Sequence, residues 1–600
     1  MSQSVTVWAQ PSLLERARAA IGRGDLLSAY DLARQDGGSG SSAELSYIAV
    51  LAMARMGEAE QAMRLYQQSG LATAGDVDSQ SLGARLLKDQ ALQNGATYSG
   101  LKQAAEAYAE AYRRSQDPFP AINAATLNLL AGDEERACVF AEAALSAPSV
   151  ASPADYYGAA TKAEALAILG REAEAMEAIE LALGLPGANV GARSTTLRQF
   201  ELLARHCAGG HQLRPLISRL TPPAVATFTG HIFRADPATE APLAAAIDAQ
   251  LEALNIGFGY GALAAGADIV IAERLLARGA TLNLVFPFRE DDFIASSVLP
   301  AGNQWLKRYY AVREQAAGIS FATLANYVHD PAQFGYGATV AMGMARLRAS
   351  HLCTRAVQLA IWDGKAKGGP AGTGHDVEAW RSTGGTTFVV SADGLDRSIA
   401  YSGGEVAPPD RCLKAFMFAD FPGFTRITED RLPHFWSRVM ATAGEVLARY
   451  SDTLDFANSW GDAVFAVFDS AEAAADAGLA LQAALLGIAP EGLGRDRPTQ
   501  MRVSLHFGPV YFGSDPITNR ETFYGTEISR AARVEALTPP GSVYASEPLA
   551  AVLANTSSDR FSATYVGKID LPKGFGQYPL YALRRRPGTT LLHAAEAVAE

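Results

Sequence analysis

The sequence predicts a multidomain protein with an all-α region, an α/β domain and an α+β domain, in that order. Up to about Gly210 the chain is rich in alanine and places apolar residues at helical spacing. From about Pro222 short β-rich runs alternate with helices, which is typical of a parallel sheet covered by helices. A run rich in Gly, Ser and Pro then precedes a second mixed region. We therefore divide the chain at residues 1–215, 222–392, 393–410 (a linker), 411–585 and 586–600 (a C-terminal tail).

The composition is that of a globular protein and disfavours nucleic acid and membrane partners. Hydrophobic residues make up 48% and charged residues 19% of the chain, enough for several cores. The net charge of -12 repels nucleic acid and anionic membranes. The N-terminus lacks the pattern of a signal peptide, and no apolar run reaches the roughly 18 residues of a membrane span. The four cysteines form no CxxC pair. We expect a cytoplasmic protein.

Three stretches of the first segment resemble one another. Each has an apolar helix, a glycine turn and a second helix with a small residue where two helices approach closely. The stretches are 46–68, 121–145 and 161–183, with turn residues Gly57, Gly132 and Gly170 and small residues Ala62, Ala137 and Ala178. The pattern resembles tetratricopeptide repeats, which have a period of about 34 residues; a generic helical bundle is the alternative. A solenoid of such repeats would bind a protein partner on its concave face.

The second segment predicts a parallel sheet with helices on both faces. Strands are expected at 225–228, 256–260, 281–287, 356–361 and 386–390, and helices at 243–254 and 338–352. Pro242 suits the first turn of the earlier helix.

Glycine-rich loops beside these strands form a candidate ligand site. Glycines let the backbone approach a phosphate or ribose, and a helix N-terminus attracts an anion. The segment GYGALAAGADIVIAERLLARG, with LNLVFPF after it, resembles the SLOG group of Rossmann-like sensors, relatives of the LOG phosphoribohydrolases. This resemblance implies a nucleotide-derived ligand, such as NAD or a second messenger, or its hydrolysis. The alternative is that the glycines serve tight packing only. The candidate residues are Gly230, His231, Gly259, Gly261, Gly266, Asp268 and Glu273.

The last large segment again mixes α and β structure. Strands are expected at 413–418, 453–458, 463–468, 501–507, 510–512 and 578–583, with a turn at Gly508 and Pro509. Helices are expected at 430–450, 470–486 and 527–535, and a short one at 591–599 in the tail.

Two aspartates of this segment stand where a metal–phosphate site needs them. Asp420 ends an apolar strand and is followed by a Gly turn, whose N–H groups can hold phosphate oxygens. Asp462 lies at the tip of a hairpin, after Gly461. Carboxylates bind hard cations, and strand ends and hairpin tips can bring the two together. A pair of metals there could activate a ribose 3′-oxygen and steady a leaving pyrophosphate.

Four motifs in this segment, FMFADFPGFTRI, NSWGDAVFAVF, FYGTEISRAARVEAL and LPKGFGQYPLYAL, resemble the catalytic domain of class III adenylyl and guanylyl cyclases, over 414–583. The resemblance implies a ferredoxin-like α+β fold and two Mg²⁺ or Mn²⁺ ions on Asp420 and Asp462. It implies that Arg533 stabilises the transition state and that Lys573 contacts the triphosphate. In this family the site lies between two catalytic domains, which implies a homodimer.

The resemblance leaves the base of the nucleoside triphosphate open. The positions that read adenine in typical adenylyl cyclases are Asn458 and Thr522 here, and the ribose-positioning Asn is Ser529. ATP is the first choice of substrate, and GTP or a pyrimidine triphosphate is the alternative. A catalytically silent nucleotide-binding scaffold is the rival function. The candidate substrate contacts are Phe421, Gly423, Phe424, Thr425, Asn458, Thr522 and Ser529.

Overall fold

The computed structural model describes residues 11–35, 42–206, 210–365, 369–399 and 410–586. It divides into two compact units, Met1–Pro222 with Ser350–Thr354, and Pro223–Ala349 with Arg355–Glu600. The helix expected at 591–599 and most of the expected linker lie outside the described residues. Among the described helices, none has the length and apolar character needed to cross a membrane.

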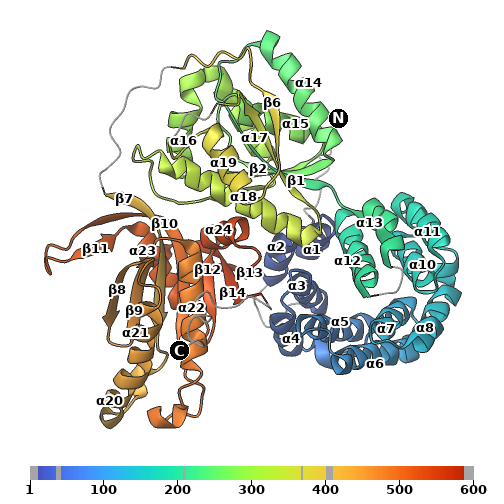
Figure 1. Cartoon of the computed structure of the whole chain (residues 1–600). Coiled ribbons are helices and arrows are strands. Elements are labelled where there is room, and N and C mark those ends of the chain that lie inside the picture. The colour runs from blue at the N-terminus through green and yellow to red at the C-terminus, as the bar shows by residue number, and fades with distance from the viewer. Residues whose placement is uncertain (1–10, 36–41, 207–209, 366–368, 400–409, 587–600) are drawn as a thin grey trace, which may run out of the picture. The chain divides into compact units, whose positions relative to one another are not determined.

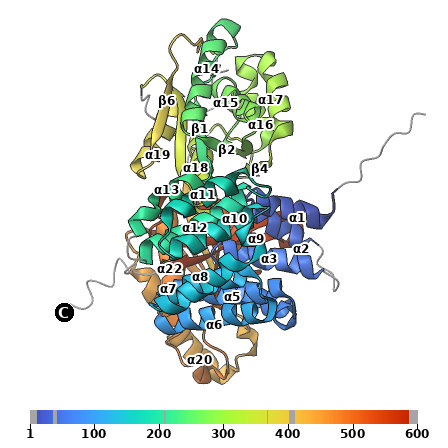
Figure 2. The same cartoon turned by 90° about the vertical axis from the view of Figure 1, so that its right-hand side faces the viewer.

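The first unit is a series of antiparallel helix pairs, as the repeats predicted (Figures 1 and 2). The turn glycines Gly57, Gly132 and Gly170 all have positive φ, between 72° and 97°, a conformation that glycine adopts without steric cost. Each lies two residues before the first residue of the second helix of a pair. The helices are α1 (Leu13–Gly22), α2 (Leu26–Arg34), α3 (Ala43–Arg55), α4 (Ala59–Gln68), α5 (Val77–Gln93), α6 (Tyr98–Ser115), α7 (Pro118–Leu130), α8 (Glu134–Ser146), α9 (Pro148–Ala151), α10 (Tyr156–Ile168), α11 (Glu172–Gly184), α12 (Val190–His206) and α13 (Arg214–Leu220).

Small buried residues set the spacing of these helices. Ala62, Ala137 and Ala178 are at most 5% exposed, so the expected close approaches are present. Asp133 caps α8 by accepting a hydrogen bond from the backbone N–H of Arg136.

The second unit begins with a parallel sheet, as predicted. Its strands are β1 (Ala224–Gly230), β2 (Ile256–Gly261), β3 (Thr281–Phe286), β4 (Gly318–Phe321), β5 (Ala356–Trp362) and β6 (Thr387–Ser391), in the order β4-β3-β2-β1-β5-β6. The order reverses between β1 and β5, and in such sheets a crevice opens at the carboxyl ends of the strands there. The helices are α14 (Pro237–Ala253), α15 (Ala267–Ala277), α16 (Glu290–Ser297), α17 (Asn303–Gln315), α18 (Ala332–Leu352) and α19 (Thr373–Ser382).

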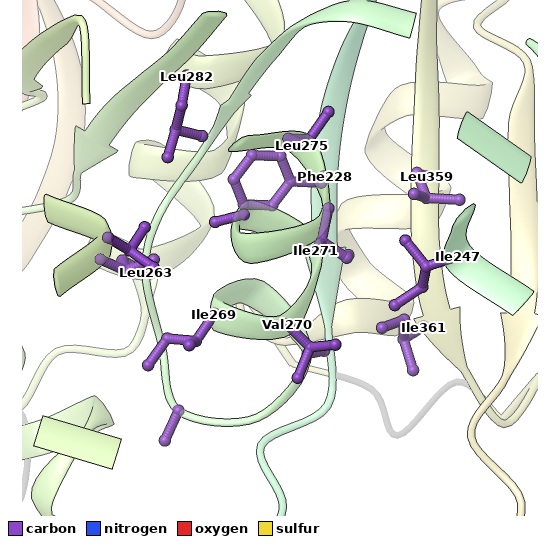
Figure 3. Packing of buried hydrophobic residues seen from close by; sticks show 14 of the residues in the cluster. Phe228, Ile247, Leu263, Ile269, Val270, Ile271, Leu275, Leu282, Leu359 and Ile361 are labelled. Carbon is purple, nitrogen blue, oxygen red and sulfur yellow. The ribbon is translucent and has the colours of Figure 1, made fainter. Parts of the chain in front are cut away.

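Successive side chains of β1 point to opposite faces of this sheet. Phe228 faces α15 and packs with Ile271 and Leu275 in a buried apolar cluster of this region (Figure 3). Thr229 faces the other way, where its hydroxyl donates to Asp376 Oδ2 of α19 at 2.7 Å. The alternation follows from the two-residue period of a strand.

Two details of this region differ from the prediction. The first helix begins at Pro237 rather than beside Pro242, which lies inside α14. Because Asp236 caps the helix and Pro237 occupies its first turn, the start moves six residues upstream. Strand β4 and helices α16, α17 and α19 were not predicted.

The rest of the second unit is a mixed sheet with helices, in agreement with the α+β prediction. Its order is β13-β14-β12-β10-β7-β9-β8, and β11 pairs with β10. The strands are β7 (Arg411–Asp420), β8 (Leu454–Trp460), β9 (Ala463–Phe468), β10 (Arg502–Ser514), β11 (Glu521–Tyr524), β12 (Val543–Ser546), β13 (Phe561–Asp570) and β14 (Gln577–Arg585). The helices are α20 (Leu432–Phe435), α21 (Ala441–Ala448), α22 (Ala471–Leu485), α23 (Thr526–Glu535) and α24 (Glu547–Thr556).

Strand β10 is the centre of this sheet and corrects one expectation. The turn expected at Gly508 and Pro509 is absent, because both residues stay in register with β7, opposite Lys414 and Leu413. The long helix expected at 430–450 is also interrupted, by a π-helical turn at Trp436–Met440 between α20 and α21.

Candidate active site and ligand cavity

The structure brings Asp420 and Asp462 together. Asp420 ends β7 and lies directly opposite Ala463 of β9, and Asp462 precedes Ala463 in the β8–β9 turn, where Gly461 has a φ of 62°. Burial and the neighbouring Asp420 carboxyl raise the pKa of Asp462. A carboxyl whose pKa is raised by a neighbouring carboxyl marks a place where a cation is favoured.

Arg502 also faces this carboxylate pair. It lies opposite Asp420 in the β7–β10 register, and its Nη2 is 2.5 Å from Asp420 Oδ2. Its Nε is 3.0 Å from Glu535 Oε1 at the end of α23. Burial, with Asp420 next in effect, raises the pKa of Glu535 to about 7. The sequence analysis missed Arg502, although a charged residue at the start of an apolar strand was a visible signal.

The carboxylate pair suits a metal that shares its coordination with a ligand. No group of three or more His, Cys, Asp or Glu side chains within the described residues could hold a metal ion. Mg²⁺ is commonly bound by one or two carboxylates together with substrate phosphates and water. Asp420 and Asp462 are therefore a fitting donor set for a metal–triphosphate complex.

The turn after Asp420 offers backbone rather than side-chain contacts. Phe421 is 1% exposed and packs against Phe435, with 5.1 Å between ring centroids. Gly423 has a φ of 80° and begins a three-residue 3-10 turn that contains Phe424 and Thr425. A short turn therefore follows Asp420 in place of a direct entry into a long helix, and of the four candidate substrate contacts here Gly423 and Thr425 are exposed.

Arg533 contacts the segment that contains Lys573 through the aromatic ring of Phe575. The guanidinium of Arg533, on α23, lies 4.4 Å from the centroid of Phe575, two residues beyond Lys573. Lys573 is exposed and has a positive φ of 63°. The Nε of Arg533 is buried and has no hydrogen-bond partner in the part of the chain that the structure describes.

The three base-reading and ribose candidates lie on separate elements. Asn458 is exposed on β8, Thr522 pairs with Gly513 on β11, and Ser529 is exposed on α23. Asn458 Oδ1 accepts a hydrogen bond from the backbone N–H of Ser459 at 2.9 Å.

A second candidate site is a cavity of about 990 Å³ at the carboxyl ends of β1, β2, β3 and β5. Gly230, His231, Gly261 and Asp268 line it. The other three candidates do not. Glu273 is paired with Arg308 at 2.6 Å, and the packing of Gly259 and Gly266 against neighbouring atoms leaves no room for a Cβ.

Two buried carboxyls dominate the polar end of this cavity. Asp268 is 7% exposed and Asp376 is 8% exposed. Burial raises the pKa of each to about 7. Asp268 Oδ2 accepts a hydrogen bond from the backbone N–H of Ala264 at 3.2 Å, whereas its Oδ1 is buried and has no hydrogen-bond partner among the described residues. That oxygen is therefore available to a hydrogen-bonding ligand.

The cavity also has an aromatic wall and a helix N-terminus that sequence reasoning missed. Tyr327 and Phe334 line it, with 5.3 Å between ring centroids. Gly372, with a φ of 96°, precedes α19 and begins the segment that contains Thr373 and Asp376. A Gly-Thr-Gly run after a strand was a signal that could have revealed this loop.

The comparisons with known proteins agree with the two resemblances at the ends of the chain. Residues 412–585 match the family model described as adenylate and guanylate cyclase catalytic domain. Residues 24–128 match the family model described as Tetratricopeptide Repeats-Sensor. No curated protein matches the chain.

Solved cyclase structures also align with part of the chain. The guanylate cyclase domain of RhGC from Catenaria anguillulae, in complex with GTP, is 18% identical, covers 29% of this chain and 97% of its own, and has a TM-score of 0.26. The adenylyl cyclase CyaB from P. aeruginosa is 19% identical over 30% of this chain and 98% of its own, with a TM-score of 0.26. The family models therefore assign an adenylate and guanylate cyclase catalytic domain to residues 412–585, which supports a nucleotidyl cyclase, and sensor-type tetratricopeptide repeats to residues 24–128.

Proposed function

We propose that the protein converts ATP into 3′,5′-cyclic AMP and pyrophosphate at a site shared between two copies of the chain. The observation that carries the proposal is the convergence of Asp420, at the end of β7, and Asp462, in the β8–β9 turn. Asp420 and Asp462 would hold divalent cations, which would supply positive charge to activate the ribose 3′-hydroxyl and to offset charge on the leaving pyrophosphate.

The reaction forms one bond and breaks one. The 3′-oxygen, on losing its proton to solvent, attacks the α-phosphorus, and the bond from that phosphorus to the bridging oxygen breaks. Arg502 offers a guanidinium beside the carboxylates, where a triphosphate oxygen would lie. Arg533 and Lys573 are placed to hold the α-phosphate and the leaving group, where fixed cations lower the barrier.

The direction of Arg533 supports a homodimer. Residues two apart on a helix point to nearly opposite sides. Glu535 reaches towards Asp420 through Arg502, so Arg533 points away from the carboxylates of its own chain, towards Phe575. A second copy is then needed to bring a guanidinium to each pair of carboxylates.

The middle domain is proposed to sense a nucleotide-derived ligand in its cavity. The aromatic pair Tyr327 and Phe334 suits a base, and the partner-free oxygen of Asp268 suits a ribose hydroxyl or an amino group. The N-terminus of α19 suits a phosphate. The position of Glu273 gives no support to hydrolysis there, since it is paired outside the cavity.

The direct test is incubation of the purified chain with ATP, GTP, CTP or UTP and Mn²⁺, with chromatographic detection of cyclic product and pyrophosphate. We expect cyclic AMP in the largest yield. A larger yield from another triphosphate would change the assigned base, which rests on Asn458 and Thr522. No cyclic product from any of the four would favour the rival function, a nucleotide-binding scaffold without turnover.

A further inference from the structure

The catalytic helix α23 accepts a buried hydrogen bond from the middle domain. Thr323, two residues after the end of β4, is 1% exposed, and its hydroxyl donates to Glu527 Oε1 at 2.6 Å. Both residues belong to the same compact unit. A second contact lies beside it, where the Tyr336 hydroxyl of α18 donates to the carbonyl oxygen of Phe507 in β10 at 2.7 Å. The two contacts tie the middle domain to the centre of the cyclase sheet.

Glu527 joins this contact to several elements of the cyclase. It is 1% exposed and lies in the first turn of α23. Its Oε2 accepts a hydrogen bond from His506 Nε2 of β10 at 2.7 Å, and Arg530 Nη1 lies 2.9 Å from the same oxygen. Nδ1 of His506 is 2.7 Å from Ser546 Oγ, at the start of α24. Although burial alone would raise the pKa of Glu527, these partners hold it at about 2. The group is therefore a carboxylate that needs every donor it has.

The position of α23 decides where the reacting groups stand. Glu527 lies two residues before Ser529 and six before Arg533 on one ten-residue helix. Ser504 also holds this helix, since its hydroxyl donates to the carbonyl oxygen of Ala531 at 3.0 Å. A misplacement of catalytic groups by about 1 Å can cost roughly 100-fold in rate, so a donor to Glu527 bears on turnover.

The elements that make these contacts also line the cavity. Phe334, Ala338 and Met342 of α18 face the cavity, whereas Tyr336 of the same helix contacts β10. Arg346, one turn beyond Met342, donates to Asn555 Oδ1 of α24 at 3.0 Å. One helix thus has one face towards the cavity and another against the cyclase.

We propose that Thr323 and Tyr336 of the middle domain are positioning residues of the cyclisation reaction, which they influence by holding Glu527, β10 and hence α23 in place. The proposal rests on the proposed cyclase function for its kinetic readout. It gives the middle domain a direct route to Arg533 that does not pass through the linker expected at 393–410.

The test compares Thr323→Val, which keeps the shape and removes the hydroxyl, with Thr323→Ser, which keeps the hydroxyl. In the full chain, Thr323→Val is expected to lower kcat by roughly 3- to 10-fold with little change in KM, and Thr323→Ser to restore it. Tyr336→Phe should act in the same direction. The matched control is Thr339→Val, since the Thr339 hydroxyl bonds only to Gly335 of its own helix. A kcat for Thr323→Val equal to that of the control would overturn the proposal.

A second measurement does not depend on turnover. Hydrogen exchange at the amides of residues 526–535 is expected to speed up several-fold in Thr323→Val and to stay unchanged in Thr339→Val. Equal exchange in both variants would overturn the positioning role even if the chain made cyclic nucleotide. Absence of product from the wild type, with faster exchange in Thr323→Val, would instead contradict the proposed function and leave the contact to α23 supported.

Discussion

This chain has two pairs of aspartate carboxyls with the same chemistry and different surroundings. Asp420 and Asp462 are half-buried at the end of β7 and in the β8–β9 turn, beside the guanidinium of Arg502. Asp268 and Asp376 lie inside a cavity at 7% and 8% exposure, and in both pairs burial raises a pKa.

This difference in exposure makes one pair suitable for binding a cation and the other suitable for hydrogen bonding to an uncharged ligand group. The open pair can bind hydrated divalent ions, because water and phosphate oxygens can complete the coordination. The enclosed pair has pKa values of about 7, so near neutral pH it is partly protonated and can both donate and accept hydrogen bonds. The first arrangement suits triphosphate chemistry, and the second suits recognition of hydroxyl or amino groups.

The largest effect is expected at the open pair. Asp462→Asn keeps the size of the side chain and removes a negative ligand, so we expect the rate of cyclic nucleotide formation to fall at least about 1,000-fold. Asp452→Asn, on an exposed turn of the same domain, should leave the rate within about 2-fold. Mn²⁺-dependent turnover by Asp462→Asn at the wild-type rate would remove the carboxylate from the mechanism.

The enclosed pair should make the free energy of unfolding depend on pH. A raised pKa means that the folded protein holds a proton that the unfolded chain has lost, so the free energy of unfolding falls as pH rises from about 4 to about 7. Asp268→Asn removes this penalty and should stabilise the protein at pH 8 by on the order of 2 to 4 kcal/mol, with much less gain at pH 5. Urea denaturation at the two pH values measures the difference. The exposed Asp291→Asn serves as control, and an equal effect in both variants would contradict the account.

Arg502 should have an intermediate effect on catalysis. Arg502→Met keeps the apolar stem of the side chain and removes the guanidinium that faces Asp420. Loss of a group that orients a metal-binding carboxylate typically costs 10- to 100-fold, and we expect kcat/KM for the metal–triphosphate to fall by about this factor. If kcat/KM were unchanged, Arg502 would be a structural ion pair only.

The smallest effect is the stabilisation by metal alone. At ten times its Kd, Mn²⁺ is expected to stabilise the wild type by about 1.4 kcal/mol, seen as a higher Tm. Asp268→Asn should keep this shift and Asp462→Asn should lose it. The opposite pattern would place the metal in the cavity.

The sequence was most informative where function is encoded locally. Asp420 and Asp462 each lie near a glycine turn at a strand end, so the local sequence alone was enough to predict both as candidate metal ligands. The helix pairs of the first unit were equally visible, since a glycine with positive φ marks every one of the three turns.

What the sequence concealed depends on distant contacts. Gly508 and Pro509 suggested a turn, but pairing with β7 keeps β10 straight through them. Arg502 looked like an ordinary charge at a strand end until the register placed it opposite Asp420. The hydrogen bond from Thr323 to Glu527 joins residues 204 positions apart. No local sequence pattern predicts a contact between residues so distant in the chain.

The most direct test of the central claim is complementation between two inactive variants. Asp462→Asn lacks a metal-binding carboxylate and Arg533→Ala lacks the guanidinium for the neighbouring copy. When the two chains are mixed in equal amounts, about half of the dimers contain one complete site, so roughly a quarter of the wild-type activity should return. If the mixture forms dimers yet stays as inactive as either variant alone, the carboxylates and the guanidinium do not meet across a subunit boundary.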